Sequence, residues 1–419
     1  TLDLSPTTIS FDVPTLTVVM ASTEKTKASS STARSTQKSG FLNAFTVATT
    51  IFIIIIAVNY NWLEETYRIF IVNRPVGQFG LDNCKIVEGL EGCEDIVIHH
   101  KSGSAFLACG NAESRMVRWF PPIGIRNEAP TVKDQAFVYD INTGIVKPLK
   151  LINYPDDDFI LHGLGMYDDP NDPENPTLFF VNHKTSGSVI EIFEHRIGTD
   201  ELKHVETVKH ELIIAPNDIA PISKNEFYVT NDIKYKHWFM RNAQLFLRLP
   251  YSDVVFHSGK TNTTNVVADG LRSANGITTN RDLSRVYVVS TLDPAIVVYD
   301  RKADNRLVEI ERIPAEGMPD NVSVDEVTNE VYYAAFLGAA DFASYVKSVG
   351  KTKNPSSAVV KISDNMNEDR YYGKKYSQKV LLEDTETFYA LTVAAVDHSR
   401  NTMLLGSLFA PRIGVCKLN

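Results

Sequence analysis

Pairs of polar residues with oxygen-bearing side chains stand immediately before short apolar runs at several places in this chain. Glu94-Asp95, Asn217-Asp218 and Asp320-Asn321 are such pairs, and Asn275 occupies a similar position alone. Carboxylate and neutral amide oxygens, with no cysteine among them, are the ligands that Ca²⁺ prefers, six to eight of them at about 2.3–2.6 Å. Brought together by the fold, these side chains would form a calcium site.

Four of these residues are acids, namely Glu94, Asp95, Asp218 and Asp320. Their negative charges would repel one another strongly inside a low-dielectric site, and two Ca²⁺ ions would neutralise all four. Successive side chains on an extended strand point to opposite sides, so an adjacent pair could serve two ions, or one ion and the fold. We therefore expect two ions, and we expect their removal to destabilise the domain.

The elements that must position these residues recur along the chain. An apolar run, a turn and a second apolar run appear six times, starting at residues 94, 162, 217, 275, 320 and 391, and the first five copies begin with Glu, His, Asn or Asp. A hairpin that recurs at roughly 40–50 residues, with longer intervals as loop insertions, is typical of β-propeller blades. Asn and Asp also mark ordinary turns, but five polar openings in phase favour an all-β, six-bladed propeller whose central axis collects them.

Two histidines belong to one of these copies. His162 opens the second copy, and His183 follows the second apolar run of the same copy, so both should lie at one end of the channel, close to the metal. Histidine is the side chain best suited to move protons near neutral pH. Either histidine alone would be structural, but together beside a metal cluster they are the candidate catalytic residues. The sequence has no Gly-x-Ser-x-Gly motif for a nucleophilic serine, which favours attack by water.

Composition sets the wider organisation of the 419 residues. The formal net charge of −9 argues against nucleic acid as a partner. Residues 1–40 are rich in Ser and Thr, and we expect them to be disordered. We expect residues 63–80 to be a linker and residues 81–419 to form the propeller.

Residues 41–62 are predominantly apolar and centre on the run Ile51-Phe52-Ile53-Ile54-Ile55-Ile56. About 20 such residues can cross a bilayer as a helix. Lysines and an arginine precede this segment, which predicts a membrane signal-anchor with the propeller on the lumenal or extracellular side. A cleaved signal peptide is the alternative, although no small-residue cleavage site follows the apolar run.

Cysteines and one sequon fit that compartment. A propeller must join its first and last strands, and a disulfide between Cys84 and Cys416 would tie this closure. Cys93 and Cys109 flank one predicted hairpin, and the sequence leaves open whether they pair or remain buried thiols. Asn262 starts the sequence Asn-Thr-Thr in a polar loop, which predicts N-glycosylation.

Taken together, these segments resemble the serum paraoxonase/arylesterase family. The resemblance covers nearly all of 81–419 in the same order. It rests on Asn83-Cys84, Glu94-Asp95, His162-Gly163-Leu164, Val181-Asn182-His183, Pro216-Asn217-Asp218-Ile219, Ala274-Asn275-Gly276-Ile277, the stretch 320–325 and the stretch 406–416.

The resemblance implies a six-bladed propeller with two calcium ions in its channel that hydrolyses lactones and aryl esters. It implies that the catalytic ion is held by Glu94, Asn217, Asn275, Asp320 and Asn321. It assigns the structural ion to Asp95, Asp218 and the backbone carbonyl of Leu164. It also implies a His162–His183 dyad, a Cys84–Cys416 disulfide and a retained N-terminal hydrophobic segment.

The sequence differs from the family pattern at the expected pocket wall. Ala335 and Phe336 stand where the family has Cys and His, and the stretch Phe409-Ala410 lacks a histidine that the family carries. Two alternatives stay open. One is a propeller enzyme like the gluconolactonases or strictosidine synthases, and the other is a non-catalytic binding module stabilised by calcium.

Overall fold

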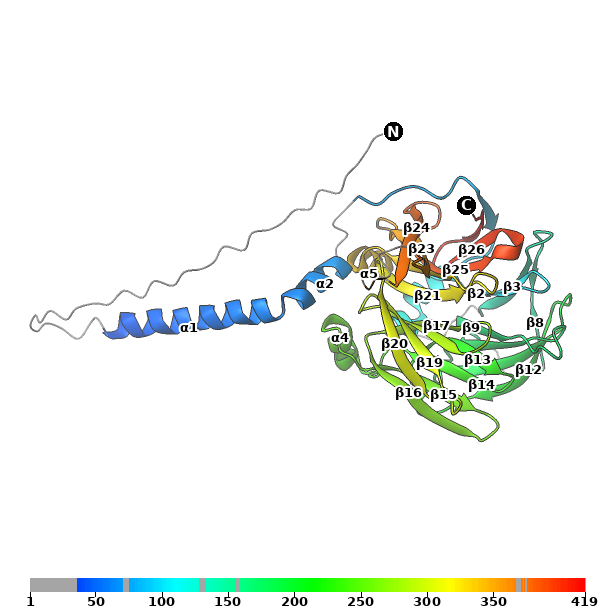
Figure 1. The fold of residues 1–419 in the computed structure, drawn as a ribbon, viewed down its shortest axis with the longest axis horizontal. Coiled ribbons are helices and arrows are strands. Elements are labelled where there is room, and N and C mark those ends of the chain that lie inside the picture. Colours follow the sequence, from blue (N-terminus) through cyan, green and yellow to red (C-terminus); the bar gives the residue numbers. More distant parts are fainter. Residues whose placement is uncertain are drawn as a thin grey trace, which may run out of the picture. The chain divides into compact units, whose positions relative to one another are not determined.

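The six repeated phrases form the first strands of six antiparallel sheets in the computed structural model (Figure 1). In every sheet the apolar run after the turn becomes the second strand and pairs with the first. Runs such as Val286-Tyr287-Val288-Val289 consist of β-branched and aromatic residues that favour a pleated, buried surface. The predicted six-bladed β-propeller is confirmed.

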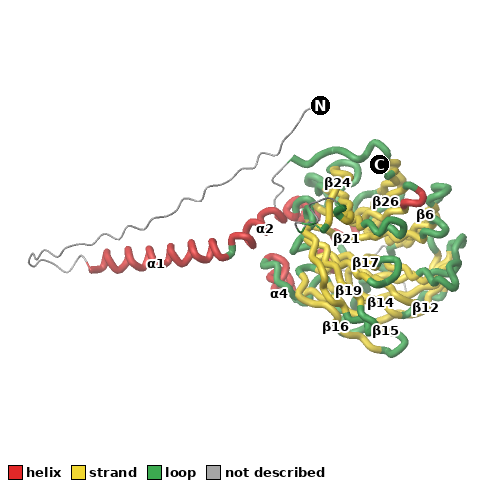
Figure 2. The backbone as a smooth tube through the Cα atoms, in the orientation of Figure 1, coloured by secondary structure: helices red, strands yellow, loops and turns green. Residues whose placement is uncertain are grey.

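The structure describes residues 36–70, 75–127, 133–155, 158–366, 371, 373 and 375–418, with only the backbone at 36–44 and 61. The chain divides into two units, Thr1–Asn61 and Trp62–Asn419, and the propeller belongs to the second. Figure 2 shows the strands of the second unit gathered into the blades, with short helices at the edges.

The first three blades follow one another along the chain. Blade 1 contains β2 (Cys93–His99), β3 (Ser104–Cys109), β6 (Gln135–Asp140) and β7 (Val146–Pro148). Blade 2 contains β9 (Leu161–Tyr167), β10 (Thr177–Asn182), β11 (Val189–His195) and β12 (Glu201–Val208), with β8 (Lys150–Ile152) at its edge. Blade 3 contains β13 (Pro216–Ser223), β14 (Glu226–Asn231), β15 (Ser252–Ser258) and β16 (Thr263–Leu271).

The last three blades complete the ring. Blade 4 contains β17 (Ala274–Thr279), β18 (Arg285–Ser290), β19 (Ala295–Arg301) and β20 (Leu307–Pro314). Blade 5 contains β21 (Met318–Val324), β22 (Val331–Phe336), β23 (Ser357–Asp364) and β24 (Tyr376–Asp384). Blade 6 contains β25 (Leu391–Asp397), β26 (Thr402–Ser407) and β27 (Arg412–Lys417), and its fourth strand is β1 (Cys84–Glu88).

Strand β1 closes the ring, because it comes from the start of the propeller and pairs with β27 from its end. Cys84 lies directly opposite Cys416 in this pairing, and the two form a disulfide. The first and last blades are therefore joined both by main-chain hydrogen bonds and by a covalent bond. The predicted ring-closing disulfide is confirmed.

Apolar side chains fill the spaces between neighbouring blades. Ile219, Phe227 and Val255 of blade 3 pack with Phe179 and Ile190 of blade 2, and comparable clusters occupy the other five blade interfaces. Burying one such side chain contributes about 1.5–3 kcal/mol. Because each inner strand also packs against the next around the axis, the channel walls are held from every side.

Short helices surround the blades. These are α3 (Ala112–Val117), α4 (Trp238–Phe246) and α5 (Ala339–Lys347), the 3-10 helices Pro121–Ile123 and His398–Arg400, and the small pair β4 (Trp119–Phe120) and β5 (Ile125–Arg126). An apolar cluster joins α3 and α5 to the ends of several blades, and it includes Phe120, Ile160, Met318 and Phe409. This cluster covers residues next to the polar phrases.

The expected linker 63–80 begins as a helix, α2 (Tyr60–Phe70). Ile69 of this helix is buried in the apolar cluster with Phe120 and Phe409. Arg248, itself buried, donates to the Glu65 carboxylate at 2.8 Å and to the hydroxyl of Thr66. Part of the segment therefore packs on the propeller, and residues 71–74 lie outside the described residues.

The N-terminal unit contains α1 (Thr36–Val58), a helix that covers most of the predicted apolar segment 41–62. It begins inside the stretch 1–40 that we expect to be disordered, and residues 1–35 lie outside the described part of the chain. Within the described residues, no single helix combines the length and apolar composition needed to cross a membrane. The segments Phe45–Val58 and Trp62–Phe70 reach that threshold only when they are taken as a pair.

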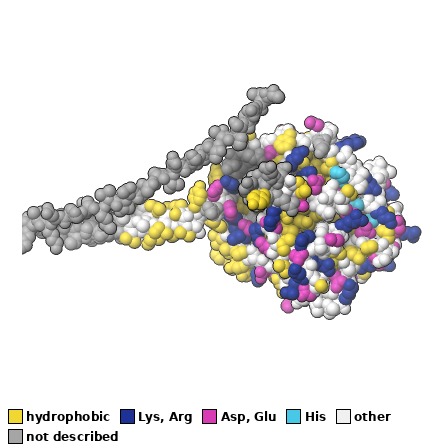
Figure 3. All heavy atoms as spheres, in the orientation of Figure 1, with side chains coloured by type: hydrophobic (Ala, Val, Ile, Leu, Met, Phe, Trp, Pro, Cys, Tyr) yellow, Lys and Arg dark blue, Asp and Glu magenta, His cyan; other side chains and the backbone are white. Residues whose placement is uncertain are grey.

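Charged side chains of both signs are interspersed over the visible face of the propeller (Figure 3). A nucleic-acid-binding surface would instead gather Lys and Arg on one face. Neither this distribution of charges nor the net charge of −9 supports a nucleic-acid partner.

Candidate metal centre and histidine pair

The inner strands depart from regular pairing at the polar phrases. In blades 2 to 5, two residues of the inner strand lie opposite one residue of its neighbour: His162-Gly163, Asn217-Asp218, Asn275-Gly276 and Asp320-Asn321. In blade 1 the pairing skips Glu94, and in blade 6 it skips Thr392. Such bulges bend a strand and re-aim its side chains, and they recur next to active sites. Here the same irregularity frees the main chain at equivalent positions of all six blades.

One set of oxygens converges without donors to satisfy it. Asn321 donates from Nδ2 to Oε1 of Glu94 at 2.9 Å and to the Glu94 carbonyl at 3.2 Å, which joins blades 5 and 1. Within the described residues, Glu94 Oε2 and the Oδ1 atoms of Asn217, Asn275 and Asn321 are all buried and have no hydrogen-bond partner. Buried acceptors are normally satisfied, and four orphans in one set need a positive partner. The donor set therefore fits a hard cation such as Ca²⁺.

The other acidic pair is bonded differently. Asp95 accepts from the N–H groups of Ile96 at 2.8 Å and Leu164 at 2.7 Å, so it links blade 1 to blade 2. Asp218 accepts from Ile219 and from Ile277 of the next blade, both at 2.7 Å. The carboxyl groups of Asp95 and Asp218 lie close enough to act on each other electrostatically. The structure thus brings Asp95 and Asp218 together. The contact that it describes at Leu164 is made by the N–H group, whereas the predicted ligand at this residue is the carbonyl oxygen.

Burial controls the acidity of these groups. Burial raises the pKa of Glu94 well above its ordinary value, and the neighbouring charges of Asp95, Asp320 and Asp218 raise it further. Burial raises the pKa of Asp320 to about 8 and that of Asp95 to about 6. The pKa of Asp218 is raised well above its ordinary value by burial and then by Asp95. Without a cation, these carboxyl groups bind protons instead.

Carboxylates alone do not make this centre. Among the described residues, no three His, Cys, Asp or Glu side chains come together in a way that could hold a metal ion. A site here depends on the three asparagine amides and on main-chain oxygens in addition to the acids. That mixture of neutral and charged oxygens matches calcium better than the transition metals, which favour nitrogen and sulfur.

The two predicted histidines lie in contact, beside Glu94. His162 Nδ1 is 3.0 Å from His183 Nε2, and His162 Nε2 is 3.6 Å from Glu94 Oε1. His183 Nδ1 is 2.9 Å from the hydroxyl of Ser188. The ring of Phe120 packs edge-on against both imidazoles. Hydrogen bonds therefore run from His162 through His183 to Ser188, and Nε2 of His162 lies beside the Glu94 carboxylate.

Both imidazoles are kept neutral. Burial lowers the pKa of His162 well below its ordinary value, with further contributions from His183 and Arg115. Burial lowers the pKa of His183 to about 3, and the positive charges of Arg115, Arg126 and Lys236 act in the same direction. A neutral imidazole can accept a proton, which a general base must do.

Arg115 and Asp134 fix the backbone next to His162. Sequence patterns did not identify either residue as part of the site. Arg115 donates to the Leu161 carbonyl at 2.9 Å, and the Leu161 N–H donates to Asp134 at 2.9 Å. The two side chains also pair with each other at 3.2 Å. The peptide unit before His162 is thus held from both sides. A buried arginine far from its partner in sequence carries no local pattern that would reveal this role.

Two glycines in the polar phrases allow the inner strands to approach closely. A Cβ at Gly163 would lie 2.3 Å from the Asn217 carbonyl oxygen, and one at Gly276 would lie 2.6 Å from the Asn321 Cα. Any side chain at either position would push neighbouring blades apart and spread the converging oxygens.

The residues that differ from the family pattern form an aromatic wall. Phe336 packs against Phe342 of α5 at 4.7 Å between ring centroids, and Phe342 packs against Phe409 at 5.8 Å. These contacts belong to the apolar cluster that also contains Phe120. Phe336 and Phe409 therefore lie in one cluster, on the side of blades 5 and 6, whereas Ala335 is buried in a separate cluster between blades 4 and 5.

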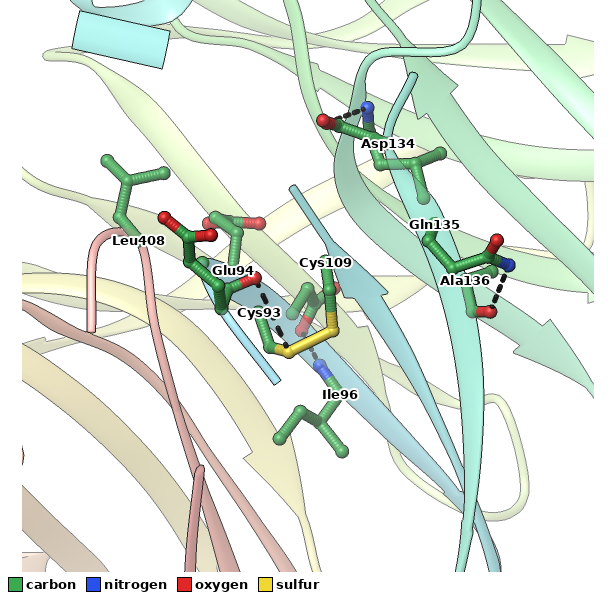
Figure 4. The surroundings of a disulfide bond; sticks show 12 residues. Cys93, Glu94, Ile96, Cys109, Asp134, Gln135, Ala136 and Leu408 are labelled. Carbon is green, nitrogen blue, oxygen red and sulfur yellow. Dashed lines mark hydrogen bonds between the residues drawn. A yellow bond between two sulfur atoms is a disulfide. The ribbon is translucent and has the colours of Figure 1, made fainter. Parts of the chain in front are cut away.

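The second pair of cysteines, which the sequence left open, forms a disulfide. Cys93 and Cys109 lie directly opposite each other on β2 and β3, and Figure 4 shows this bond with Glu94 and Leu408 beside it. Because Glu94 follows Cys93, the bond fixes the strand that carries this oxygen ligand. The other candidate modification site, Asn262, is exposed in the turn between β15 and β16.

Comparison with known proteins agrees with this geometry. The sequence profile of the family described as Arylesterase matches residues 76–418. Serum paraoxonase/arylesterase 1 of Mus musculus is 29% identical over 341 residues, which cover 80% of this chain and 89% of that protein. Serum paraoxonase/lactonase 3 of Oryctolagus cuniculus is 30% identical over 331 residues, which cover 78% of this chain and 86% of that protein. The chain therefore belongs to the arylesterase family of the serum paraoxonases.

Proposed function

We propose that this chain is a calcium-dependent carboxylic ester hydrolase that acts on lactones and aryl esters. The proposal is carried by the four orphaned oxygens of Glu94, Asn217, Asn275 and Asn321, which lie next to a hydrogen-bonded pair of neutral histidines. Family membership supports it, since the relatives carry the names arylesterase and lactonase.

Two calcium ions would occupy the channel. Glu94, Asn217, Asn275, Asp320 and Asn321 would hold the first, and Asp95, Asp218 and the carbonyl of Leu164 would hold the second. Bound at the first set, calcium supplies a Lewis acid that polarises the ester carbonyl and stabilises negative charge on its oxygen. The second set links blade 1 to blade 2 and blade 3 to blade 4 through main-chain N–H groups, which supports a structural role for its ion.

His162 is the general base. To accept a proton from water at Nε2, neutral His162 must carry its own hydrogen on Nδ1, from which it donates to Nε2 of His183. His183 then carries its hydrogen on Nδ1 and donates to Ser188. This arrangement keeps the lone pair of His162 Nε2 directed toward the orphaned oxygens, where the attacking water would be bound.

The clamp around Leu161 holds this base in position. Arg115 and Asp134 fix the peptide before His162, and the Phe120 ring lies between the Arg115 guanidinium, at 4.9 Å, and both imidazoles. A misplacement of about 1 Å at a catalytic group can cost on the order of 100-fold in rate. Phe336 and Phe409 are buried and support the partly exposed ring of Phe342, which offers an apolar contact suited to aryl and alkyl groups.

The compartment follows from the same features. Two disulfides within the described residues fit an oxidising compartment, so we propose that the propeller lies in the lumen or outside the cell, with glycosylation at Asn262. We further propose that residues 41–62 anchor it to a membrane. Trp238 and Phe239 on α4 are 75% and 64% exposed, and such aromatic side chains suit a membrane interface.

The decisive experiment measures hydrolysis of γ-lactones, δ-lactones and phenyl acetate by the full chain, with calcium and after its removal. We expect turnover that requires calcium. We expect Asn275→Ala and Asp320→Ala to abolish turnover. His162→Gln should lower lactone hydrolysis by about 100-fold or more at neutral pH. Calcium binding without turnover of any of these substrates would refute the enzymatic proposal and leave a calcium-stabilised binding module.

A further inference from the structure

A pocket of about 230 Å³ opens beside the histidine pair. His183 and Ser188, the outer members of the hydrogen-bonded chain, form part of its wall, together with Trp119, Arg126, Asp232 and Lys236. Trp119 donates from its indole nitrogen to the carbonyl of His183 at 2.8 Å, so the pocket wall is attached to the dyad itself. With each water occupying about 30 Å³, the pocket has room for roughly eight waters or a short polar chain.

Positive charge gathers around this pocket. Arg126 and Lys236 line it, and Arg126 donates to the Lys236 carbonyl at 3.1 Å. Arg241 lies behind it and donates to the carbonyl of Pro122, another lining residue. The Nε of Arg241 is buried and has no partner among the described residues. Three cations thus converge on one wall.

Little negative charge opposes them. Burial and the positive charges of Arg126 and Lys209 lower the pKa of Lys236. No acid among the described residues acts on it in the opposite direction. Among the described lining residues, Asp232 is the one that carries a carboxyl group. It acts on Arg126 and Arg241, but burial raises its pKa to about 7, so it only partly offsets their charge at neutral pH. Lys184, which also lines the pocket, is already paired with Glu191 at 2.8 Å.

Arg126 and Lys236 are both exposed, so a dissolved anion can reach them. Like charges held together repel one another, and an anion relieves that repulsion. We propose that this pocket is an anion-binding subsite of the active centre, and that the preferred substrates are esters or lactones bearing a carboxylate away from the scissile bond. Lys236 and Arg126 would bind that carboxylate while the ester carbonyl lies at the calcium set. This inference rests on the proposed function, because it uses the same histidine pair as the reacting end.

The test compares phenyl acetate with monophenyl succinate, which carries an additional carboxymethyl group on its acyl chain and therefore one negative charge. The calcium-loaded full chain is assayed in neutral detergent, and the specificity ratio is kcat/KM for monophenyl succinate divided by kcat/KM for phenyl acetate. We expect a wild-type ratio above one that falls as salt is raised. Lys236→Met should reduce the ratio roughly tenfold, the usual size of one hydrogen bond to a charged group. Lys379→Met removes the same charge from an exposed position on β24 and should leave the ratio unchanged.

A second measurement separates this inference from the proposed function. N-phenylsuccinamic acid, an amide analogue of the charged ester, is titrated into the calcium-loaded protein, and its Kd is measured by calorimetry for wild type and Lys236→Met. About tenfold weaker binding in the variant supports the subsite even if no ester is turned over. Equal Kd values, or a specificity ratio that is the same in wild type and Lys236→Met, would overturn the subsite while leaving ester hydrolysis intact.

Discussion

Removing calcium at a series of pH values tests the central electrostatic argument. In the metal-free fold, burial raises the pKa of Asp95 from 3.8 to about 6 and that of Asp320 from 3.8 to about 8. The folded state therefore holds these protons more tightly than the unfolded chain does. The stability that comes from this tighter proton binding is fully present below pH 4. It is lost as the pH rises through 6, where Asp95 ionises, and then through 8, where Asp320 ionises.

The size of the effect follows from the shifts. One pKa unit corresponds to about 1.4 kcal/mol, so Asp95 alone accounts for a loss of about 3 kcal/mol between pH 4 and pH 6. Asp320 adds a loss of the same sign up to pH 8, although the two groups interact and their contributions do not simply add. The neutral histidines act in the opposite direction, but they are common to the metal-free and calcium-loaded forms. At about 2 °C per kcal/mol for a large domain, the metal-free Tm should therefore fall by about 6 °C relative to the calcium-loaded Tm.

The assay is thermal unfolding of protein passed over a chelating resin, from pH 4.5 to pH 8, with and without added calcium. We expect the gap between the calcium-loaded Tm and the metal-free Tm to widen as pH rises. Asp320→Asn should flatten the metal-free curve and weaken the response to calcium. Asp364→Asn, an exposed position at the end of β23, is the matched control and should behave as wild type. Parallel curves, or a gap that narrows toward pH 8, would refute the reasoning.

Three further predictions concern the frame around this centre. Replacing both Cys84 and Cys416 by Ser should lower the free energy of unfolding by about 5 kcal/mol in urea titrations, because this bond closes a loop of 332 residues; an unchanged midpoint would contradict its role in closure. Arg115→Met should cost about 3–5 kcal/mol in the same titrations and also lower kcat, since it leaves a buried carboxylate unpaired and frees the peptide before the base. Ser188→Ala should lower kcat up to about tenfold with little change in KM, because it removes only the hydrogen bond that holds His183 in one tautomer. A larger effect on KM than on kcat would assign Ser188 to substrate binding.

Much of the fold could be predicted because each hairpin has a local sequence pattern, and that pattern is repeated along the chain. The polar phrase at Asn217-Asp218 and the apolar run Phe227-Tyr228-Val229 suffice to define one hairpin, and six copies define the ring. Cys84 and Cys416 were pairable because a ring must join its ends. The Cys93–Cys109 bond could not be decided in this way, since its formation depends on the register of two particular strands.

The candidate site was predicted in part. The acids, amides and histidines stand in phase with the repeats, so their convergence followed from the ring. Arg115 and Asp134 could not be found, because their contacts with Leu161 join segments that are 46 and 27 residues apart. The basic pocket could not be predicted from the sequence for the same reason, because Arg126, His183 and Lys236 come from separate loops.

By itself, the sequence determined which residues form strands and which oxygens reach the axis, because alternation and repetition are properties of the chain alone. It left open how two adjacent residues share one channel, since side chains on a regular strand point to opposite sides. The tertiary structure decided this by interrupting the pairing at Asn217-Asp218 and its counterparts. It also decided the protonation of Asp320 and His183, because burial and the charges of other blades act through space and leave no local trace in the sequence.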